Sequence, residues 1–353
     1  MFRVAISLAL LLLTIATRAQ ETPSDNPFTT GPPVKETRLS GAIVTTINNG
    51  DFVHPTFSPD GKVLAYSNVL VKGDFENTEV FLHNLDTNKR SILLNSRKAA
   101  TYATYKAFVS EMKWTRAKRL EVSIGDGDVD STKLIFDPQR RRLLTEQFEG
   151  GDEFEARPLS RVEQKAYEQA RSLFPSFPRE VLDNALRTTA LVIPDQGIIL
   201  QKNYAGHDFN IWFLDFQNKS VKALINLPDR SINAFNGGVA FKSAIVLAVS
   251  DGTKTYLFLY RAGKISRSGE FNSGGFGFIE VKHVSSLKVI FLLRTHGMSD
   301  RGDNPLFVFD GIQLLRINDH SELYDAAVDP AGRRIAYCYW AGDKRHIVVK
   351  EFK

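Results

Sequence analysis

The sequence has 353 residues, 43% of them hydrophobic and 24% charged, and its 45 basic and 40 acidic side chains leave a formal net charge of +5. This mild basic excess does not indicate a nucleic-acid-binding protein. The single cysteine, Cys338, excludes an internal disulfide, so core packing must provide the stability. Its place between Tyr337 and Tyr339 in a predicted strand indicates a buried, unreactive thiol.

The chain begins with a pattern that is typical of an exported protein. Residues 1–19 combine a basic start at Arg3, an apolar run over residues 4–16 and a small-x-small site that ends at Ala19. This pattern predicts a signal peptide cleaved after Ala19 and a periplasmic or secreted protein. The alternative is an uncleaved anchor, but the run falls short of the roughly twenty apolar residues that span a bilayer. We expect no integral membrane segment after cleavage, and a flexible leader over residues 20–36, which are rich in Pro, Thr and Gly.

One short phrase occurs near both ends of the chain. The stretch HPTFSPDGKVLAYSN at 54–68 is followed much later by AAVDPAGRRIAYCYW at 326–340. Pro59 aligns with Pro330 and Gly61 with Gly332, both at an offset of 330 − 59 = 332 − 61 = 271. Each copy indicates a tight turn followed by an alternating strand, so one module is used twice.

Further strands with Asp, Asn or Gly turns divide the chain into modules. Their apolar centres are separated by 54, 77, 46, 49 and 41 residues, and they lie at Val80, Leu134, Ile211, Leu257, Leu306 and Ile347. Apart from the 77, these steps are close to the length of a four-stranded propeller blade. Six modules follow, at 52–96, 105–147, 188–227, 232–269, 273–317 and 321–353. The last module lacks a fourth strand, so residues 38–47 are predicted to pair with 346–352 and close the ring.

The phrase PTFSPDGKVLAYSN and the later strand TEVFLHNLD resemble the TolB-type, WD-repeat-like propeller repeat. The first module matches closely, the sixth matches in part through Asp329 to Gly332, and the middle four keep the strand pattern. The six modules and this resemblance together predict an all-β fold, a six-bladed β-propeller over residues 37–353. The sequence departs from TolB in that it leaves no room for the N-terminal α/β domain of that protein. Such repeats also occur in prolyl-oligopeptidase-like enzymes, so the resemblance indicates architecture more than activity.

The long step of 77 residues contains a predicted helical insert at 157–188, between the second and third blades. Ser160 and Glu163 form a Ser-x-x-Glu capping box, followed by an apolar stripe of Val162, Ala166, Ala170 and Leu173. A second helix, with Pro178 in its first turn, carries Val181, Leu182, Ala185 and Leu186. The insert is either a lid or docking element or a passive packing element. Its deletion is expected to leave the propeller folded.

The strand order predicts two faces with different charge. The loops between second and third strands, and between blades, form a candidate ligand-binding face with Asp126, Asp128, Asp130, His207, Asp208, His296 and Asp300. The turns of the opposite face form a candidate polyanion-binding face with Arg116, Lys118, Arg119, Arg140, Arg141 and Arg142. Exposed turn cations that are merely solvated are the alternative for the second face.

The alternating carboxylates of Asp126, Asp128 and Asp130 resemble the first half of a calcium loop. Ser131 stands where that loop needs glycine, so an acidic hairpin turn is the alternative, and no other cofactor is predicted. The sequence contains no Gly-x-Ser-x-Gly elbow, phosphate loop or dinucleotide fingerprint.

These patterns favour a non-catalytic exported binding or scaffold protein that contacts another protein or a cell-envelope polymer. The alternative is a metal-assisted hydrolase or lyase at the mouth of the propeller channel. Carboxylates and histidines from three or more blades that converge within metal-binding reach at the axis would favour the alternative.

Overall fold

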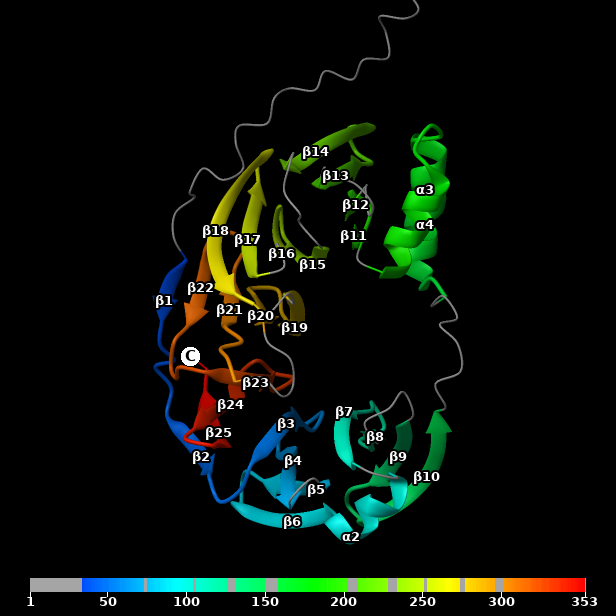
Figure 1. Cartoon of the computed structure of the whole chain (residues 1–353). Coiled ribbons are helices and arrows are strands. Elements are labelled where there is room, and N and C mark those ends of the chain that lie inside the picture. The colour runs from blue at the N-terminus through cyan, green and yellow to red at the C-terminus, as the bar shows by residue number, and fades with distance from the viewer. Residues whose placement is uncertain are drawn as a thin grey trace, which may run out of the picture.

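The chain consists mainly of antiparallel β-sheets in the computed structural model (Figure 1). The structure describes residues 34–72, 75–103, 106–125, 131–149, 158–188, 190–201, 209–227, 234–250, 253–273, 277–295 and 301–352. Within these ranges the strands form six sheets, five with four strands and one with five. The prediction of an all-β protein is confirmed.

The sheets follow the chain in order, and each predicted module matches the successive strands of one sheet, except that β1 and β2 from the N-terminal segment join sheets 5 and 6 and that β10 and β18 extend a few residues further. Sheet 1 contains β3 (Phe52–Phe57), β4 (Val63–Lys72), β5 (Phe75–Asn84) and β6 (Lys89–Leu94), and sheet 2 contains β7 (Phe108–Trp114), β8 (Leu120–Gly125), β9 (Ser131–Asp137) and β10 (Arg142–Glu149). Sheet 3 contains β11 (Leu191–Ile193), β12 (Gly197–Gln201), β13 (Phe209–Asp215) and β14 (Ser220–Leu227), and sheet 4 contains β15 (Ala234–Phe241), β16 (Ala244–Ser250), β17 (Lys254–Arg261) and β18 (Lys264–Asn272). Sheet 5 contains β19 (Phe278–Val284), β20 (Val289–Arg294), β21 (Leu306–Phe309), β22 (Leu314–Ile317) and β1 (Lys35–Thr37), and sheet 6 contains β23 (Leu323–Val328), β24 (Arg334–Ala341), β25 (Lys344–Glu351) and β2 (Ile43–Ile47).

The six sheets are arranged around a common centre (Figure 1). One edge strand of each sheet lies toward that centre, and these innermost strands are β3, β7, β11, β15, β19 and β23. Short helices α2 (Ser96–Ala99) and η1 (Ala100–Tyr102) follow sheet 1, and the longer helices α3 (Arg161–Leu173) and α4 (Arg179–Thr188) lie between sheets 2 and 3 in the chain. None of the helices in the described ranges has the length and apolar character needed to cross a bilayer.

The repeated phrase forms the same tight turn in sheets 1 and 6. Gly61 has φ +70° and donates its N–H to the Ser58 carbonyl at 2.7 Å. In the second copy Gly332 has φ +68° and donates to the Asp329 carbonyl at 2.8 Å. Glycine adopts this left-handed backbone without a steric penalty, so it is the residue that both copies keep at the turn.

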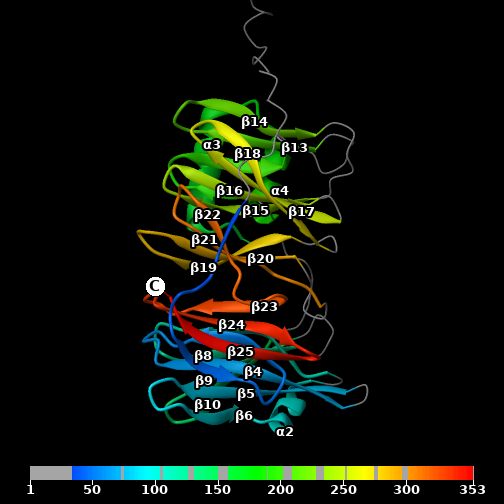
Figure 2. The same ribbon diagram turned by 90° about the vertical axis from the view of Figure 1, so that its left-hand side faces the viewer.

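The N-terminal segment joins the last two sheets. β2 pairs antiparallel with β25, from Ile43 opposite Lys350 to Ile47 opposite Ile347, so the later half of the predicted segment 38–47 lies beside the final strand. Just before it, β1 pairs parallel with β22, which places Lys35 and Glu36 in sheet 5 (Figure 2). The predicted leader over 20–36 therefore ends too late, because its last residues form a strand.

Apolar clusters join neighbouring sheets in an unbroken series. Buried side chains connect sheet 2 to sheet 1, sheet 1 to sheet 6, sheet 6 to sheet 5, sheet 5 to sheet 4 and sheet 4 to sheet 3. Cys338 lies in the cluster between sheets 6 and 1, where its thiol donates to the Phe52 carbonyl at 2.9 Å. The thiol is buried as predicted, and burial raises its pKa well above the usual value.

The series ends at the helical hairpin formed by α3 and α4. One cluster packs the hairpin on sheet 3, with Leu182 and Leu186 against Ile198 and Leu200. The opposing side of sheet 2 is charged instead, since Lys113 lies 3.4 Å from Glu111 and 3.7 Å from Glu121. Within the described residues, no buried apolar cluster connects sheet 2 to the hairpin. The hairpin therefore covers the side of sheet 3 that faces sheet 2 (Figure 1).

The predicted capping box is present, because Ser160 Oγ accepts from the Glu163 N–H and Glu163 Oε2 accepts from the Ser160 N–H. The predicted stripe is partly wrong, since Ala166 and Ala170 are buried but Val162 is 51% exposed. The contacts support the packing role of the insert. They also reverse the expectation that deletion is harmless, because removing the hairpin would expose the apolar side of sheet 3.

Candidate functional site

The residues predicted for the ligand-binding face lie outside the described residues. This applies to Asp126, Asp128, Asp130, His207, Asp208, His296 and Asp300, and therefore also to the predicted calcium loop. In the part of the chain that the structure describes, no group of three or more His, Cys, Asp or Glu side chains has an arrangement that could hold a metal ion.

The structure places the predicted polyanion-binding residues at one end of sheet 2. Arg116, Lys118 and Arg119 occupy the turn between β7 and β8, and residues 140–142 lie at the turn between β9 and β10. All six side chains are exposed. Lys118 is the most neutralised of them, because its Nζ lies 3.1 Å from Asp60 Oδ2. A hydrogen bond from Ser58 is the main cause that lowers the pKa of Asp60 to about 2, so this partner stays ionised.

A different set of charged residues meets near the centre of the sheets, and we call it the central charged cluster. It comes from three sheets, with Glu280, Lys282 and Arg294 on sheet 5, Asp325 on sheet 6 and His54 on sheet 1. Lys282 Nζ lies 3.0 Å from Asp325 Oδ1, and Arg294 Nη2 lies 2.7 Å from the same oxygen. Glu280 accepts from Lys282 at 2.6 Å and from Arg294 Nε at 2.8 Å. Two acids and two bases are thus fully paired.

Burial makes this pairing strong. The Asp325 side chain is 5% exposed, so desolvation alone would raise its pKa. Lys282, Arg294 and His54 outweigh that effect, and the pKa of Asp325 lies well below its usual value. The carboxylates also raise the pKa of Arg294 against the opposing effect of burial. Glu280, at 36%, is the most exposed side chain among these four charged residues.

His54 has an unusual backbone conformation for its place in β3. Its φ is +53°, although it precedes Pro55 and is neither glycine nor asparagine. It lies in a bulge, where the pairing of β3 with β4 shifts between Val53 and Thr56. The bulge directs Nδ1 to within 3.6 Å of Asp325 Oδ2. Such conformations cost about 1–3 kcal/mol and are concentrated at functional sites.

An apolar pocket of about 410 Å³, the central pocket, lies beside the charged cluster. Its walls come from the first strands of sheets 3, 4 and 5 and include Leu191, Gly238, Phe278 and Ile279. Phe278 is 48% exposed and stands opposite Arg294 in the β19 and β20 pairing. Phe278 and Glu280 share one side of β19, so Phe278 lies between the pocket and the charged cluster.

A pair of glycines shapes the pocket wall on β15. Gly237 has φ +80°, which glycine adopts at little cost. A Cβ at Gly238 would lie 2.6 Å from the Val246 carbonyl oxygen, a distance that requires the backbone to move. The absence of side chains at both positions keeps this part of the wall open.

Sequence reasoning missed the central charged cluster. The available signal was ionisable residues within apolar strands, as in FIEVKHV at 278–284, LYDAAV at 323–328 and VIFLLR at 289–294. Two of these segments are the innermost strands of their sheets, β19 and β23, where a charge indicates a position near the centre.

Sequence comparison gives no relative, since no model of a known protein family matches the chain and no curated protein matches it. Solved structures are similar at low level. An oligogalacturonate lyase in complex with manganese is 11% identical with TM-score 0.41, over 92% of this chain and 99% of that one. TolB from Acinetobacter baumannii is 13% identical with TM-score 0.31, over 86% of this chain and 64% of that one. The β-propeller domain of the Trilobed protease from Pyrococcus furiosus is 12% identical with TM-score 0.30, over 85% of this chain and 82% of that one.

The chain spans less than two thirds of the TolB chain it matches. Similarity at such low identity and TM-score gives no information about the activity, ligand or partner of this chain. The class of protein is therefore defined by the topology of the described residues, which is six mainly antiparallel sheets around a common centre.

Proposed function

We propose that the protein is an exported, non-catalytic binding or scaffold β-propeller, with six blades closed by β2 on β25. Export rests on the sequence of residues 1–19. The ligand is a segment of a partner protein that binds at the mouth of the propeller channel, with an apolar side chain in the central pocket. The observation that carries the proposal is the half-exposed Phe278 between an apolar pocket and a rigid charged cluster.

The charge pairing supports binding more than catalysis. A general acid or base works best with a pKa near the working pH. The basic neighbours of Asp325 lower its pKa, away from neutral pH. Both carboxylate oxygens of Glu280 accept hydrogen bonds from cationic side chains. Asp325 therefore keeps its negative charge without exchanging protons at neutral pH. A pre-organised polar rim beside an apolar pocket is the usual form of a binding site.

Affinity capture from the envelope fraction of the source cells tests this proposal. A partner that the native protein retains is expected to bind at least tenfold less well to Phe278→Ser, because the variant removes the aromatic wall of the pocket. Phe148→Ser is the matched control, since Phe148 is 70% exposed on the outermost strand β10. Equal retention by both variants would contradict the proposed site.

The cell-envelope polymer is a second ligand class, favoured by the six cations at the turns of sheet 2. We expect the triple replacement of Arg140, Arg141 and Arg142 by alanine to lower the salt concentration that elutes the protein from heparin, because fewer counterions are displaced on binding. Lys118→Met should change elution much less, because Asp60 already pairs with that lysine. An unchanged elution of the triple variant would rule out this surface.

A metal-assisted hydrolase or lyase at the channel mouth is the second candidate function, favoured by the strained His54 beside Asp325. His54→Asn separates the two functions, because asparagine tolerates a positive φ. The enzyme would be favoured if the native protein turned over polysaccharide or peptide substrates with added divalent metal and His54→Asn did not. Partner capture that persists in His54→Asn without any turnover would favour the binding protein.

A further inference from the structure

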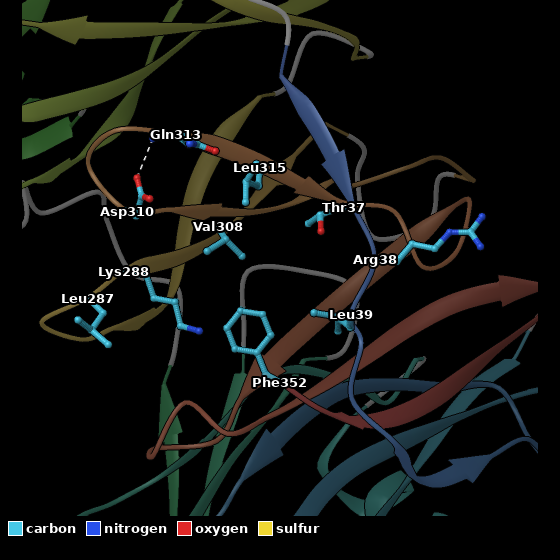
Figure 3. A pocket seen from close by; sticks show the side chains of 10 residues that line it. All are labelled: Thr37, Arg38, Leu39, Leu287, Lys288, Val308, Asp310, Gln313, Leu315 and Phe352. Atoms are coloured by element: carbon cyan, nitrogen blue, oxygen red, sulfur yellow. Dashed lines mark hydrogen bonds between the residues drawn. The ribbon is translucent and has the colours of Figure 1, made fainter.

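A second pocket, of about 350 Å³, lies where both ends of the chain meet sheet 5. Its apolar walls are Leu39 from the N-terminal segment, Val308 and Leu315 from β21 and β22, and Phe352 from the C-terminus (Figure 3). The volume is within the range of small-molecule sites, about 300–1,000 Å³. We call it the terminal pocket, and it is separate from the central pocket.

One cation points into this apolar space. Lys288 Nζ lies 3.4 Å from the centre of the Phe352 ring (Figure 3). No carboxylate among the described residues forms an ion pair with it, and desolvation by burial lowers its pKa. Arg38 also lines the pocket, but its guanidinium extends away from the other side chains.

The one acid in the pocket wall is already engaged. Asp310 Oδ1 accepts the N–H groups of Ile312 and Gln313, both at 2.7 Å, within its own turn. These bonds lower the pKa of Asp310 and hold its carboxylate in the turn. The terminal pocket therefore combines apolar walls with a single lysine that lacks an anion, which is the complement of a molecule with one negative charge and an apolar body.

We propose that the terminal pocket binds a small monocarboxylate with an apolar body, its carboxylate at Lys288 Nζ and its body against Leu39, Leu315 and Phe352. A free fatty acid and the apolar C-terminal residue of a peptide share this chemistry. The site is independent of the proposed partner-binding function, so either can fail without the other.

Calorimetric titration of the full chain with octanoate tests the site. Saturable binding at one site is expected, with at least tenfold weaker binding of octan-1-ol, which lacks the charge, and of butanoate, which lacks the body. Lys288→Met keeps most of the side-chain volume and should weaken octanoate binding at least tenfold. Lys264→Met, at an exposed turn lysine, is the matched control and should bind like the native protein.

A second measurement needs no variant. Octanoate should protect Lys288 from reductive methylation in the native protein, as read by peptide mass spectrometry, and leave Lys264 reactive. Tighter binding of octanoate than of N-acetylleucine would assign a free fatty acid, and the reverse order would assign a peptide C-terminus. The proposed site would be overturned if neither octanoate nor N-acetylleucine bound saturably. It would also be overturned if octan-1-ol bound as tightly as octanoate, or if Lys288→Met bound octanoate as tightly as the native protein.

Discussion

Asp325→Asn is expected to lower the free energy of unfolding by about 3–5 kcal/mol, because it removes the more buried of the two anions from an ion-pair cluster. Lys282 and Arg294 would then share Glu280 alone, with side chains that are only 12% and 16% exposed. Urea denaturation measures the change. Asp195→Asn is the matched control, since Asp195 pairs with Lys165 at 2.8 Å but both side chains are at least 70% exposed. Such a surface pair contributes about 0–1 kcal/mol.

The pH dependence of the same variant provides a further check. The folded-state pKa of Asp325 is depressed below its unfolded value, so its stabilising effect is complete above the unfolded pKa, at about pH 4. That effect is lost as the pH falls toward the folded-state pKa. The stability difference between the native protein and Asp325→Asn should therefore narrow below about pH 4. A difference that stays constant between pH values near 6 and 3 would show that Asp325 is not held as the pairing anion.

Leu182→Ala should lower the free energy of unfolding by about 2–5 kcal/mol, because it leaves a cavity between the hairpin and sheet 3. Leu182 is 1% exposed and packs in the cluster that includes Ile198 and Leu214. Val162→Ala, on the neighbouring helix at 51% exposure, is the control and should change stability by no more than about 0.5 kcal/mol.

The same comparison distinguishes the two roles of the insert. A passive cover of sheet 3 predicts that Leu182→Ala destabilises the whole protein in one transition. If the hairpin were a detachable lid, Leu182→Ala would make the hairpin unfold in a separate, earlier transition. The midpoint for the unfolding of the sheets would then stay the same as in the native protein. That outcome would restore the expectation that the insert can be deleted.

Much of the fold was predictable from local signals. The paired turns at Gly61 and Gly332, the strands that follow them, and the capping box at Ser160 depend on neighbouring residues, so the sequence displays them directly. The pairing of residues 43–47 with β25 was expected because the last module lacked one strand. The surface covered by the hairpin was not predictable, because an amphipathic stripe specifies an apolar contact and not its partner.

The central charged cluster was hidden for a related reason. His54, Lys282 and Asp325 lie on three sheets and are far apart in the sequence, and only the register of separate strands brings them together. The bulge that gives His54 its positive φ depends on the pairing of β3 with β4. A composition or motif search cannot detect contacts of this kind, although charges within the first strands pointed to the centre.

Photo-crosslinking in the source cells tests the account most directly. A benzophenone-bearing phenylalanine analogue placed at Phe278 is expected to form one discrete covalent adduct with a partner protein on irradiation, because that side chain borders the central pocket and is 48% exposed. The same analogue at Phe148, 70% exposed on β10, should give no such adduct. Adducts at Phe148 with none at Phe278 would contradict a binding site at the centre of the sheets.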